Sequence, residues 1–206
     1  MIREPNMTRL AILISGRGSN MMALSDAIRD GRIRNAEIVI VISDQSAAPG
    51  LEKARSCGLK TVIIERRGLV REEHEQRLLN TLRQFDVDLV CLAGYMRLLS
   101  PCFTDAYRRR ILNIHPSLLP AFPGLDAQRQ ALEHGVKWSG CTVHFVDDTL
   151  DGGPIVAQSV VPVRDDDTVE TLSARILAQE HQLYVEAVDL VVRGEYEVVG
   201  RRVLGV

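Results

Sequence analysis

Short apolar runs alternate with longer amphipathic segments along the first half of the chain. Four unbroken runs have the length of strands buried on both faces, namely Leu10–Ile14, Glu37–Ile42, Thr61–Ile64 and Leu89–Leu92. The segments between them have helical spacing, over Met21–Arg29, Pro49–Cys57 and Arg71–Phe85. Gly31 and Gly58 stand where the first two helices would end. This alternation predicts a doubly wound, mostly parallel α/β sheet with right-handed crossovers.

The pattern changes in the second half, after a fifth predicted strand over Ile111–Ile114. A proline-rich loop follows, and then a short helix over Ala127–Glu133. The runs Cys141–Val146 and Ile155–Val163 flank a glycine-rich turn, which favours an antiparallel strand pair. The C-terminal half is therefore expected to add antiparallel strands to the parallel sheet.

The last long amphipathic segment, Thr168–Val192, predicts a helix capped by Asp167 or Thr168. A chain of 206 residues with 46% hydrophobic and 25% charged residues suits one soluble globular domain. We expect this single domain over residues 8–200, with residues 1–7 and 201–206 as terminal extensions.

Charge and cysteine content narrow the classes of function. The formal net charge of −2 provides no global field for nucleic acid, so no nucleic-acid partner is expected. The four cysteines form neither a C-x-x-C pair nor a metal-ligand cluster, and we expect buried thiols in a reducing cytoplasm. Met1–Thr8 lacks the apolar core of a signal peptide, and no apolar run reaches the roughly 18 residues of a membrane helix. The sequence thus predicts a cytoplasmic protein.

A glycine-rich segment, Ser15-Gly-Arg-Gly-Ser-Asn20, joins the first strand to the first helix. The amides of Gly18, Ser19 and Asn20 could converge at the helix N-terminus to cradle a phosphate. The alternative is a tight turn capped by Ser19 or Asn20, and spacing alone does not separate the two. The P-loop lysine and the third glycine of the dinucleotide fingerprint are missing, so ATP and NAD are poorly supported.

Polar residues also follow later strands. Asn113 and His115 lie two apart, so both would point into the crevice at the carboxyl edge of the sheet, although most such histidines are structural. The acidic turn Asp147–Pro154 could present a carboxylate to a histidine or simply form a solvated β-turn. Its spacing does not fit a calcium loop. Met96–Leu99 directly follows the fourth predicted strand on the same crevice side.

Six motifs occur together in an order that resembles the folate-dependent formyltransferases, and among them those acting on glycinamide ribonucleotide. They are Ile14–Asn20, Leu92–Pro101, Leu112–Pro120, Cys141–Val146, Leu150–Pro154 and Gln179–His181. The resemblance implies a Rossmann-like formyltransferase that moves a formyl group from 10-formyltetrahydrofolate, as co-substrate, to the amine of 5'-phosphoribosylglycinamide in purine biosynthesis. It implies no metal and no membrane partner, and it leaves a homodimer open.

Carried over residue by residue, the resemblance implies three groups of site residues. The catalytic residues would be Asn113, His115 and Asp151, with His144 in a supporting position. The nucleotide site would be Gly18, Ser19, Asn20 and Glu180, the last on the ribose. The folate site would be Arg71, Met96, Arg97, Leu98, Leu99, Asn113, Asp147 and Asp151. The chain departs from the family pattern at Asp126 and Gln128, where some members have histidines, and at Val185, where proline is expected.

The chemistry implied is direct attack of the amine on the formyl carbon. Asn113 and a protonated His115 would stabilise the oxyanion, each by roughly 3–4 kcal/mol as in comparable sites. Asp151 would keep the imidazole protonated and assist proton transfer.

Three alternatives remain from the sequence. A formyltetrahydrofolate hydrolase and a methionyl-tRNA formyltransferase share the catalytic motif but are disfavoured by chain length. A non-catalytic nucleotide- or folate-binding module would be expected to lack one of the three catalytic residues, and all three are present.

Overall fold

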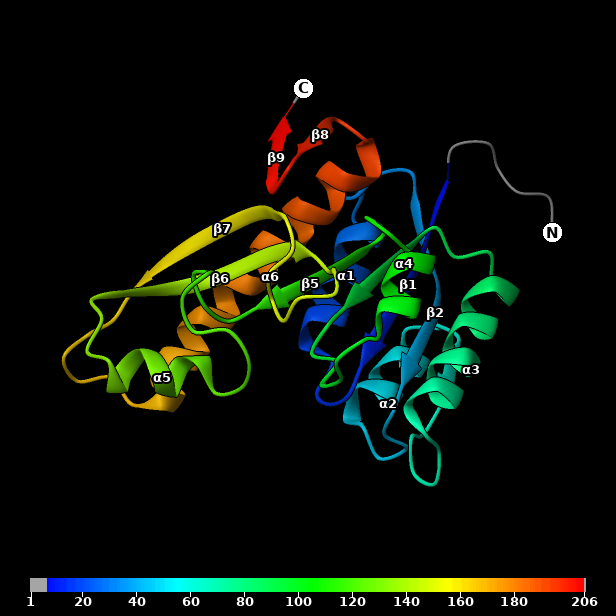
Figure 1. Ribbon diagram of the computed structural model, residues 1–206, viewed down its shortest axis with the longest axis horizontal. Coiled ribbons are helices and arrows are strands. Elements are labelled where there is room, and N and C mark those ends of the chain that lie inside the picture. Colours follow the sequence, from blue (N-terminus) through cyan, green and yellow to red (C-terminus); the bar gives the residue numbers. More distant parts are fainter. Residues whose placement is uncertain (1–6, 206) are drawn as a thin grey trace.

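One nine-stranded sheet with helices on both faces makes up the computed structural model, which describes residues 7–205 (Figure 1). Its strands are β1 Thr8–Ile14, β2 Ala36–Ser43, β3 Thr61–Ile63, β4 Leu89–Leu92, β5 Ile111–His115, β6 Trp138–Phe145, β7 Ile155–Pro162, β8 Tyr196–Val199 and β9 Arg202–Gly205. They lie in the order β3-β2-β1-β4-β5-β6-β7-β9-β8. The first five are parallel neighbours, whereas β6 is antiparallel to both β5 and β7. The predicted fold class is therefore confirmed.

The helices cover the two faces of this sheet unequally. They are α1 Ser19–Arg29, α2 Pro49–Ser56, α3 Arg71–Gln84, α4 Pro101–Ala106, α5 Ala127–Glu133 and α6 Val169–Arg193. Apolar side chains of α1, α2, α5 and α6 pack in the core on one face, and those of α3 and α4 pack in the core on the other. From β1 to β3 each new strand is added on one side of β1, whereas β4 and β5 are added on its other side. The strand order therefore reverses between the neighbours β1 and β4, and the loops that follow these two strands lie next to each other.

Strand β1 explains why unbroken apolar runs become central strands. Leu10 and Ile12 belong to the core shared with α1 and α6, whereas Ala11 and Leu13 belong to the core shared with α3. All four side chains are fully buried. Successive side chains of a strand point to opposite faces, so a strand covered on both sides must be apolar throughout. Full burial of a leucine or isoleucine side chain contributes about 1.5–3 kcal/mol.

The longest helix, α6, has clear signals at both ends. The Thr168 hydroxyl accepts the Thr171 amide N–H, and the Thr171 hydroxyl accepts the Thr168 N–H, which together make a capping box. Of the two predicted caps, Thr168 is therefore the one used, and Asp167 is not. Gly194 ends the helix in the left-handed conformation, with φ 68°.

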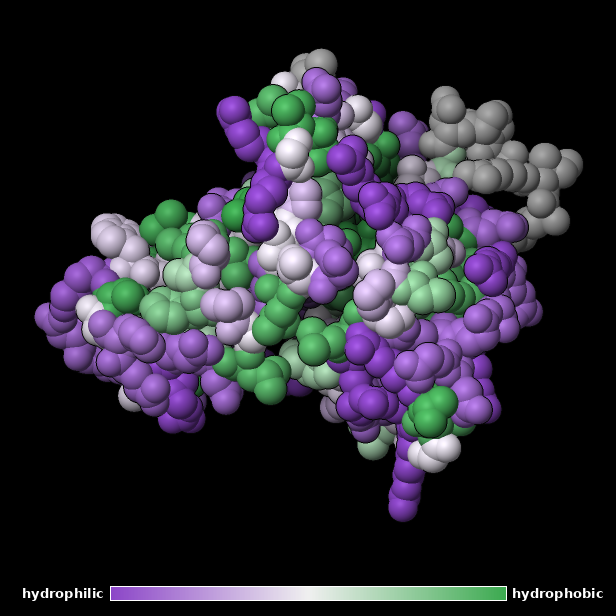
Figure 2. All heavy atoms as spheres, viewed as in Figure 1, coloured by the Kyte–Doolittle hydropathy of each residue, from purple (hydrophilic) through white to green (hydrophobic). Residues whose placement is uncertain are grey.

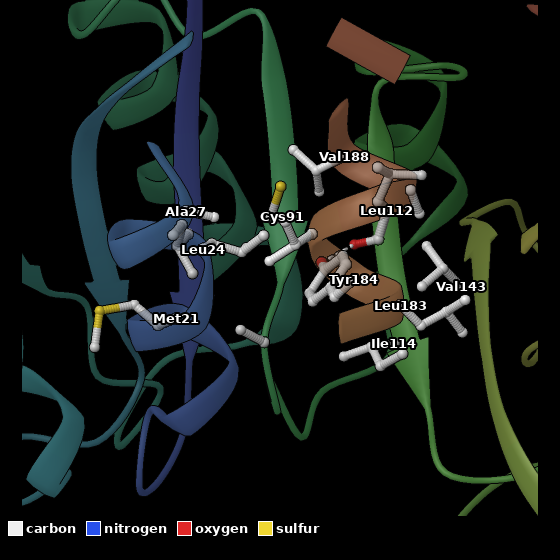
Figure 3. Close-up of a cluster of buried hydrophobic side chains, with 14 of the residues drawn as sticks. Met21, Leu24, Ala27, Cys91, Leu112, Ile114, Val143, Leu183, Tyr184 and Val188 are labelled. Atoms are coloured by element: carbon white, nitrogen blue, oxygen red, sulfur yellow. Dashed lines mark hydrogen bonds between the residues drawn. The ribbon is translucent and has the colours of Figure 1, made fainter. Parts of the chain in front are cut away.

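Tyr184 fixes α6 to the middle of the sheet. Its buried hydroxyl lies 3.0 Å from the Leu92 carbonyl oxygen and 3.1 Å from that of Leu112, so one O–H is shared between β4 and β5 (Figure 3). Figure 3 shows the ring between Cys91 on β4 and Leu112 on β5. Leu112 directly precedes Asn113, so this contact anchors the strand that carries the candidate catalytic residues.

Three short elements were not predicted. Helix α4 spans only six residues, too few for a helical period to show. Strands β8 and β9 form a hairpin, and Arg202 of β9 pairs with Ile155 of β7. The sheet thus continues to residue 205, past the expected boundary at 200. Residues 1–6 and 206 of the expected extensions lie outside the described residues.

The expectation of buried thiols is wrong for two of the four cysteines. Cys91 and Cys141 are buried in strands, whereas Cys57 and Cys102 are exposed. Cys57 is the C-terminal cap of α2, and Cys102 lies in the first turn of α4. All four are free thiols. No helix within residues 7–205 is long and apolar enough to cross a membrane.

Candidate active site

Two neighbouring antiparallel strands bring Asn113, His115 and His144 to the same side of the sheet. Asn113 of β5 is the register partner of His144 of β6, and His115 is the partner of Thr142. Side chains of directly opposed residues lie on the same face, and residues two apart on one strand share that face. The β6–β7 pairing shifts register between Val143 and His144, where β7 carries one extra residue.

The tautomer of His144 follows from its partners. Its Nδ1 lies 2.9 Å from the Phe145 carbonyl oxygen, which can only accept, so Nδ1 donates. Burial, the largest cause, lowers the pKa of His144, with the nearby His115 acting in the same direction and Asp151 opposing it. The ring is therefore neutral, and its Nε2 accepts a hydrogen bond of 3.2 Å from Asn113 Nδ2. This fixes the Asn113 amide with its nitrogen toward His144 and leaves its second N–H to donate elsewhere.

His115 is buried between a carbonyl and a carboxylate. Its Nε2 donates to the Phe122 carbonyl oxygen at 2.9 Å. Its Nδ1 lies 3.5 Å from Asp151 Oδ2, and the two side chains are 7% and 12% exposed. The other Asp151 oxygen, Oδ1, lies 3.7 Å from His144 Nε2. One carboxylate thus stands between both histidines, as the sequence predicted for His115.

The backbone of the turn after β6 sets the position of Asp151. Its φ of 49° is left-handed, a conformation that aspartate tolerates better than most residues. Its Oδ2 accepts the Gly124 amide N–H at 2.8 Å, which links the turn to the loop after β5. A Cβ on Gly153 would lie 1.9 Å from the Phe145 carbonyl oxygen, so only glycine fits where the turn meets β6. Asp147 accepts from the amide and hydroxyl of Thr149 and thereby closes the same turn.

The loop after β5 is held over the sheet by Thr142. The Thr142 hydroxyl donates to the Ser117 carbonyl at 2.7 Å and accepts the Leu119 amide N–H at 3.0 Å. Gln158 of β7 donates to the Leu119 carbonyl and to the Thr142 hydroxyl. These contacts fix the course of the chain toward Phe122, whose carbonyl accepts from His115.

The glycine-rich loop is shaped by close contact with α2. Gly18, and neither Ser19 nor Asn20, is the N-terminal cap of α1, with φ 69° and no side-chain capping bond. The capping role considered for Ser19 or Asn20 is therefore wrong. A Cβ on Gly18 would lie 2.8 Å from the Gly50 Cα, so a side chain at this position would clash with α2 whatever the loop binds. The Gly50 amide also donates to the Gly16 carbonyl at 3.0 Å.

Asn20 and Glu180 face each other across α1 and α6. The Asn20 Nδ2 donates to Glu180 Oε2 at 2.8 Å, and both residues are buried. Burial, the largest cause, raises the pKa of Glu180, while the Asn20 hydrogen bond and the positive charges of His115 and Arg17 lower it. The Asn20 side-chain oxygen is buried and has no hydrogen-bond partner in the described part of the chain.

Of the residues expected on the folate side, Met96–Leu99 lie after β4 next to the glycine-rich loop, and Arg71 lies at the start of α3. Met96 and Leu98 are each 64% exposed. Arg97 Nε donates to the buried carboxylate of Asp44 at 2.8 Å, and Arg71 Nη2 donates to the Leu98 carbonyl at 2.9 Å. Both arginines therefore hold protein groups, a use that their positions in the sequence did not reveal. Green apolar residues gather in the centre of the face seen in Figure 2, between polar regions to either side.

The structure brings the predicted catalytic residues and His144 into one cluster. Gly18, Ser19 and Asn20 lie at the start of α1, with Glu180 bonded to Asn20 from α6, and the Met96–Leu99 segment follows β4 with Arg71 bonded to it from α3. Sequence reasoning missed the supporting residues Ser15, Asp44, Gly50 and Glu75. Glu75 had a signal, since it is a charged residue three, four and seven positions before the apolar Leu78, Leu79 and Leu82. Ser15, Asp44 and Gly50 had none, because their contacts come from other strands and helices.

The three departures from the family pattern lie apart from the catalytic cluster. Asp126 is the exposed N-terminal cap of α5, with φ 56°, and Gln128 follows in its first turn. Val185 lies on α6 and is buried in the core. Within residues 7–205 no group of three or more His, Cys, Asp and Glu side chains is arranged to hold a metal ion. Two open depressions lie at the opposite, amino ends of the strands, one of them around Tyr107 and Arg110.

Comparison with known proteins gives consistent matches. The family model for formyl transferases matches residues 8–188. The chain is 46% identical over 192 residues to the human trifunctional purine biosynthetic protein adenosine-3, covering 93% of this chain and 19% of that protein. It is 44% identical to Escherichia coli phosphoribosylglycinamide formyltransferase, covering 85% of this chain and 82% of that one.

A solved structure is similar over nearly the whole chain. The glycinamide ribonucleotide transformylase 1 of Symbiobacterium toebii superimposes with a TM-score of 0.95 at 50% identity, covering 98% of this chain and 96% of that chain. By contrast, the chain spans less than a fifth of the length of the animal relatives, between 14% and 19%.

Proposed function

The chain belongs to the formyl transferase family, and on that premise we propose that it transfers a formyl group from 10-formyltetrahydrofolate to the amine of 5'-phosphoribosylglycinamide. The products are formylglycinamide ribonucleotide and tetrahydrofolate, in a step of purine synthesis. Relatives named phosphoribosylglycinamide formyltransferase support this choice of substrate over formyltetrahydrofolate hydrolysis.

The observation that carries the proposal is the cluster of Asn113, His115 and Asp151 at the carboxyl end of β5. Formyl transfer to an amine needs donors for the oxygen that becomes negative when the amine attacks the formyl carbon. Preorganised donors act best when they do not have to reorient during the reaction. The free N–H of Asn113 meets this requirement, because His144 holds the amide in one orientation.

His115 supplies the second donor in this mechanism. Its Nε2 already donates to a carbonyl oxygen, that of Phe122. We propose that the formyl oxygen takes the place of the Phe122 carbonyl when the donor binds, so the same N–H then stabilises the oxyanion. The Asp151 carboxylate lies 3.5 Å from Nδ1, so it attracts positive charge on the ring. The proton lost by the attacking amine passes to the folate nitrogen through His115, Asp151 or a water between them.

The two substrates are proposed to meet at this cluster from neighbouring loops. The amides of Gly18, Ser19 and Asn20 at the start of α1 would hold the phosphate, with Glu180 near the ribose. Arg71, the Met96–Leu99 segment and the Asp147–Asp151 turn would hold the folate. The homodimer considered from the sequence and the cytoplasmic location remain predictions.

Purified protein mixed with 10-formyltetrahydrofolate tests the proposal, with and without glycinamide ribonucleotide. We expect loss of the formyl group only when the nucleotide is present, together with one formylated nucleotide for each tetrahydrofolate formed. Equal formyl loss without the nucleotide would identify a hydrolase. No reaction in either mixture, from protein shown to be folded, would leave a binding module of the same fold.

A further inference from the structure

The segment Met96–Ser100, which follows β4, has the side chains of Met96 and Leu98 outward and its polar atoms inward, while Leu99 packs against the core. Met96 and Leu98 are each 64% exposed, whereas the polar groups of the same segment bond to buried or half-buried partners. A segment free to fold for stability alone would bury these two side chains, each worth about 1.5–3 kcal/mol. Contacts from neighbouring elements therefore hold it in this arrangement.

Four contacts from three other parts of the chain hold the segment. The Met96 amide donates to the Ser15 hydroxyl at 3.0 Å, and Arg97 pairs with Asp44, whose side chain is 1% exposed. The other two come from helix α3. Arg71 donates to the Leu98 carbonyl, and Glu75 accepts from Ser100.

Glu75 is the centre of the α3 contacts. Its Oε1 accepts from the Ser100 amide at 2.8 Å and from Arg71 Nε at 3.1 Å, and its Oε2 accepts from the Ser100 hydroxyl. The carboxylate therefore fixes Ser100 directly, and it orients Arg71 so that the guanidinium reaches the Leu98 carbonyl. The stretch from the Leu98 carbonyl to Ser100 is thereby tied to one buried side chain.

Stability alone does not explain a carboxylate at this position. The Glu75 side chain is 7% exposed and stands on the face of α3 that also buries Leu78, Leu79 and Leu82. A buried ion pair is often no more stable than apolar residues of the same volume, because both charges lose water. Nearby, the buried hydroxyl of Tyr95 and Oδ1 of Asp44 have no hydrogen-bond partner within residues 7–205. Stability of the fold therefore does not account for the buried polar groups in this part of the protein.

We propose that Glu75 is a positioning residue for the formyl donor. It touches no substrate and holds Met96–Ser100 so that Met96 and Leu98 present an apolar surface to the ring system of a reduced folate. The inference rests on the proposed function, since it takes the formyl donor to bind at this segment. Glu75 would thus set the affinity for the formyl donor through Met96–Ser100, without contacting the donor itself.

Steady-state kinetics of Glu75→Gln, with each substrate varied in turn, test the proposal. Glutamine has the same shape, but its amide group cannot accept from the Ser100 hydroxyl and Arg71 together. We expect the KM for 10-formyltetrahydrofolate to rise about tenfold, the loss expected for one or two charge-assisted hydrogen bonds, with kcat and the nucleotide KM within about twofold. Glu72→Gln, an exposed position on the same helix, is the matched control and should change neither KM.

Ser100→Ala provides a milder second variant if Glu75→Gln does not fold. It removes the hydroxyl bonded to Glu75 but keeps the Ser100 amide, and should shift the donor KM in the same direction by a smaller factor. An unchanged donor KM, an equal rise in both KM values, or a fall in kcat alone would overturn the proposal. Absence of formyl transfer in the wild-type protein would refute the proposed function instead, so the two failures are distinguishable.

Discussion

Replacing Asp151 by asparagine removes one charge from the candidate active site and changes little else. Asparagine also tolerates the left-handed φ of 49°, and its side-chain oxygen can still accept the Gly124 amide N–H. The lost component is the attraction between the carboxylate and positive charge on the His115 ring, whose Nδ1 lies 3.5 Å away. The Tm should therefore fall by no more than about 4 °C, the effect of roughly 1 kcal/mol in a domain of this size.

The size of the kinetic effect follows from this distance. Two unit charges 3.5 Å apart attract by about 5 kcal/mol at an effective dielectric constant near 20. Part of this attraction offsets the desolvation of the pair, and part is already present before the reaction begins. We expect about 2–3 kcal/mol to be lost from the transition state, which corresponds to a kcat lower by roughly 30- to 150-fold.

Single-turnover and steady-state assays of Asp151→Asn, with both substrates saturating, measure this loss. The KM values should change little, since the charge acts mainly on the transition state. Asp166→Asn, at an exposed position outside the candidate site, is the control and should keep wild-type kcat. A kcat within about threefold of wild type for Asp151→Asn would refute the reasoning and leave Asp151 as a residue that only shapes the turn.

Three further predictions concern buried groups. Glu180→Gln should keep the hydrogen bond from Asn20. Because burial raises the pKa of Glu180, removing its charge should maintain or increase the Tm at pH 7, while the KM for the nucleotide rises. A lower Tm with an unchanged nucleotide KM would contradict this. Tyr184→Phe should lower stability by about 1–2 kcal/mol, seen in thermal unfolding as a Tm lower by roughly 3–6 °C, with kcat unchanged. Burial lowers the pKa of His144, so the imidazole binds a proton more readily in the unfolded chain than in the folded one. The free energy of unfolding should therefore be at its full value above about pH 6.5 and decrease as the pH falls below it. Thermal unfolding between pH 8 and 5 should show a smaller loss in His144→Gln.

The parallel half of the fold could be predicted because burial on two faces leaves a direct mark in the sequence. Leu89–Leu92 is a strand with the predicted bounds, and Ala127–Glu133 is a helix with the predicted bounds. The strand β6 begins at Trp138, three residues before the predicted start, because Trp138 and Ser139 carry no apolar run of their own. The β8–β9 hairpin gave no signal, since Glu197 and Arg202 interrupt its apolar residues.

The catalytic cluster could be anticipated only in part. That Asn113 and His115 share a face follows from their spacing, whereas their proximity to Asp151 follows from the antiparallel pairing of β5 with β6. Arg71 and Glu75 are four residues apart on α3, a spacing visible in the sequence, but Arg97 holds Asp44 and Arg71 holds the Leu98 carbonyl, partners from distant parts of the chain. Pairings of this kind leave no local pattern, so side-chain partners had to come from the structure.

The antiparallel junction between β5 and β6 also bears on how this activity is inherited. Asn113 and His115 lie before residue 116, and His144 and Asp151 lie after residue 143, so a genetic exchange with a breakpoint between these positions would deliver half a catalytic set to each product. Neither product would then carry the complete cluster of Asn113, His115 and Asp151. The family match over residues 8–188 spans both halves, and the animal relatives carry the same stretch as a small fraction of much longer chains. A unit of this kind can be joined to other enzymes at its ends but cannot be divided in its middle.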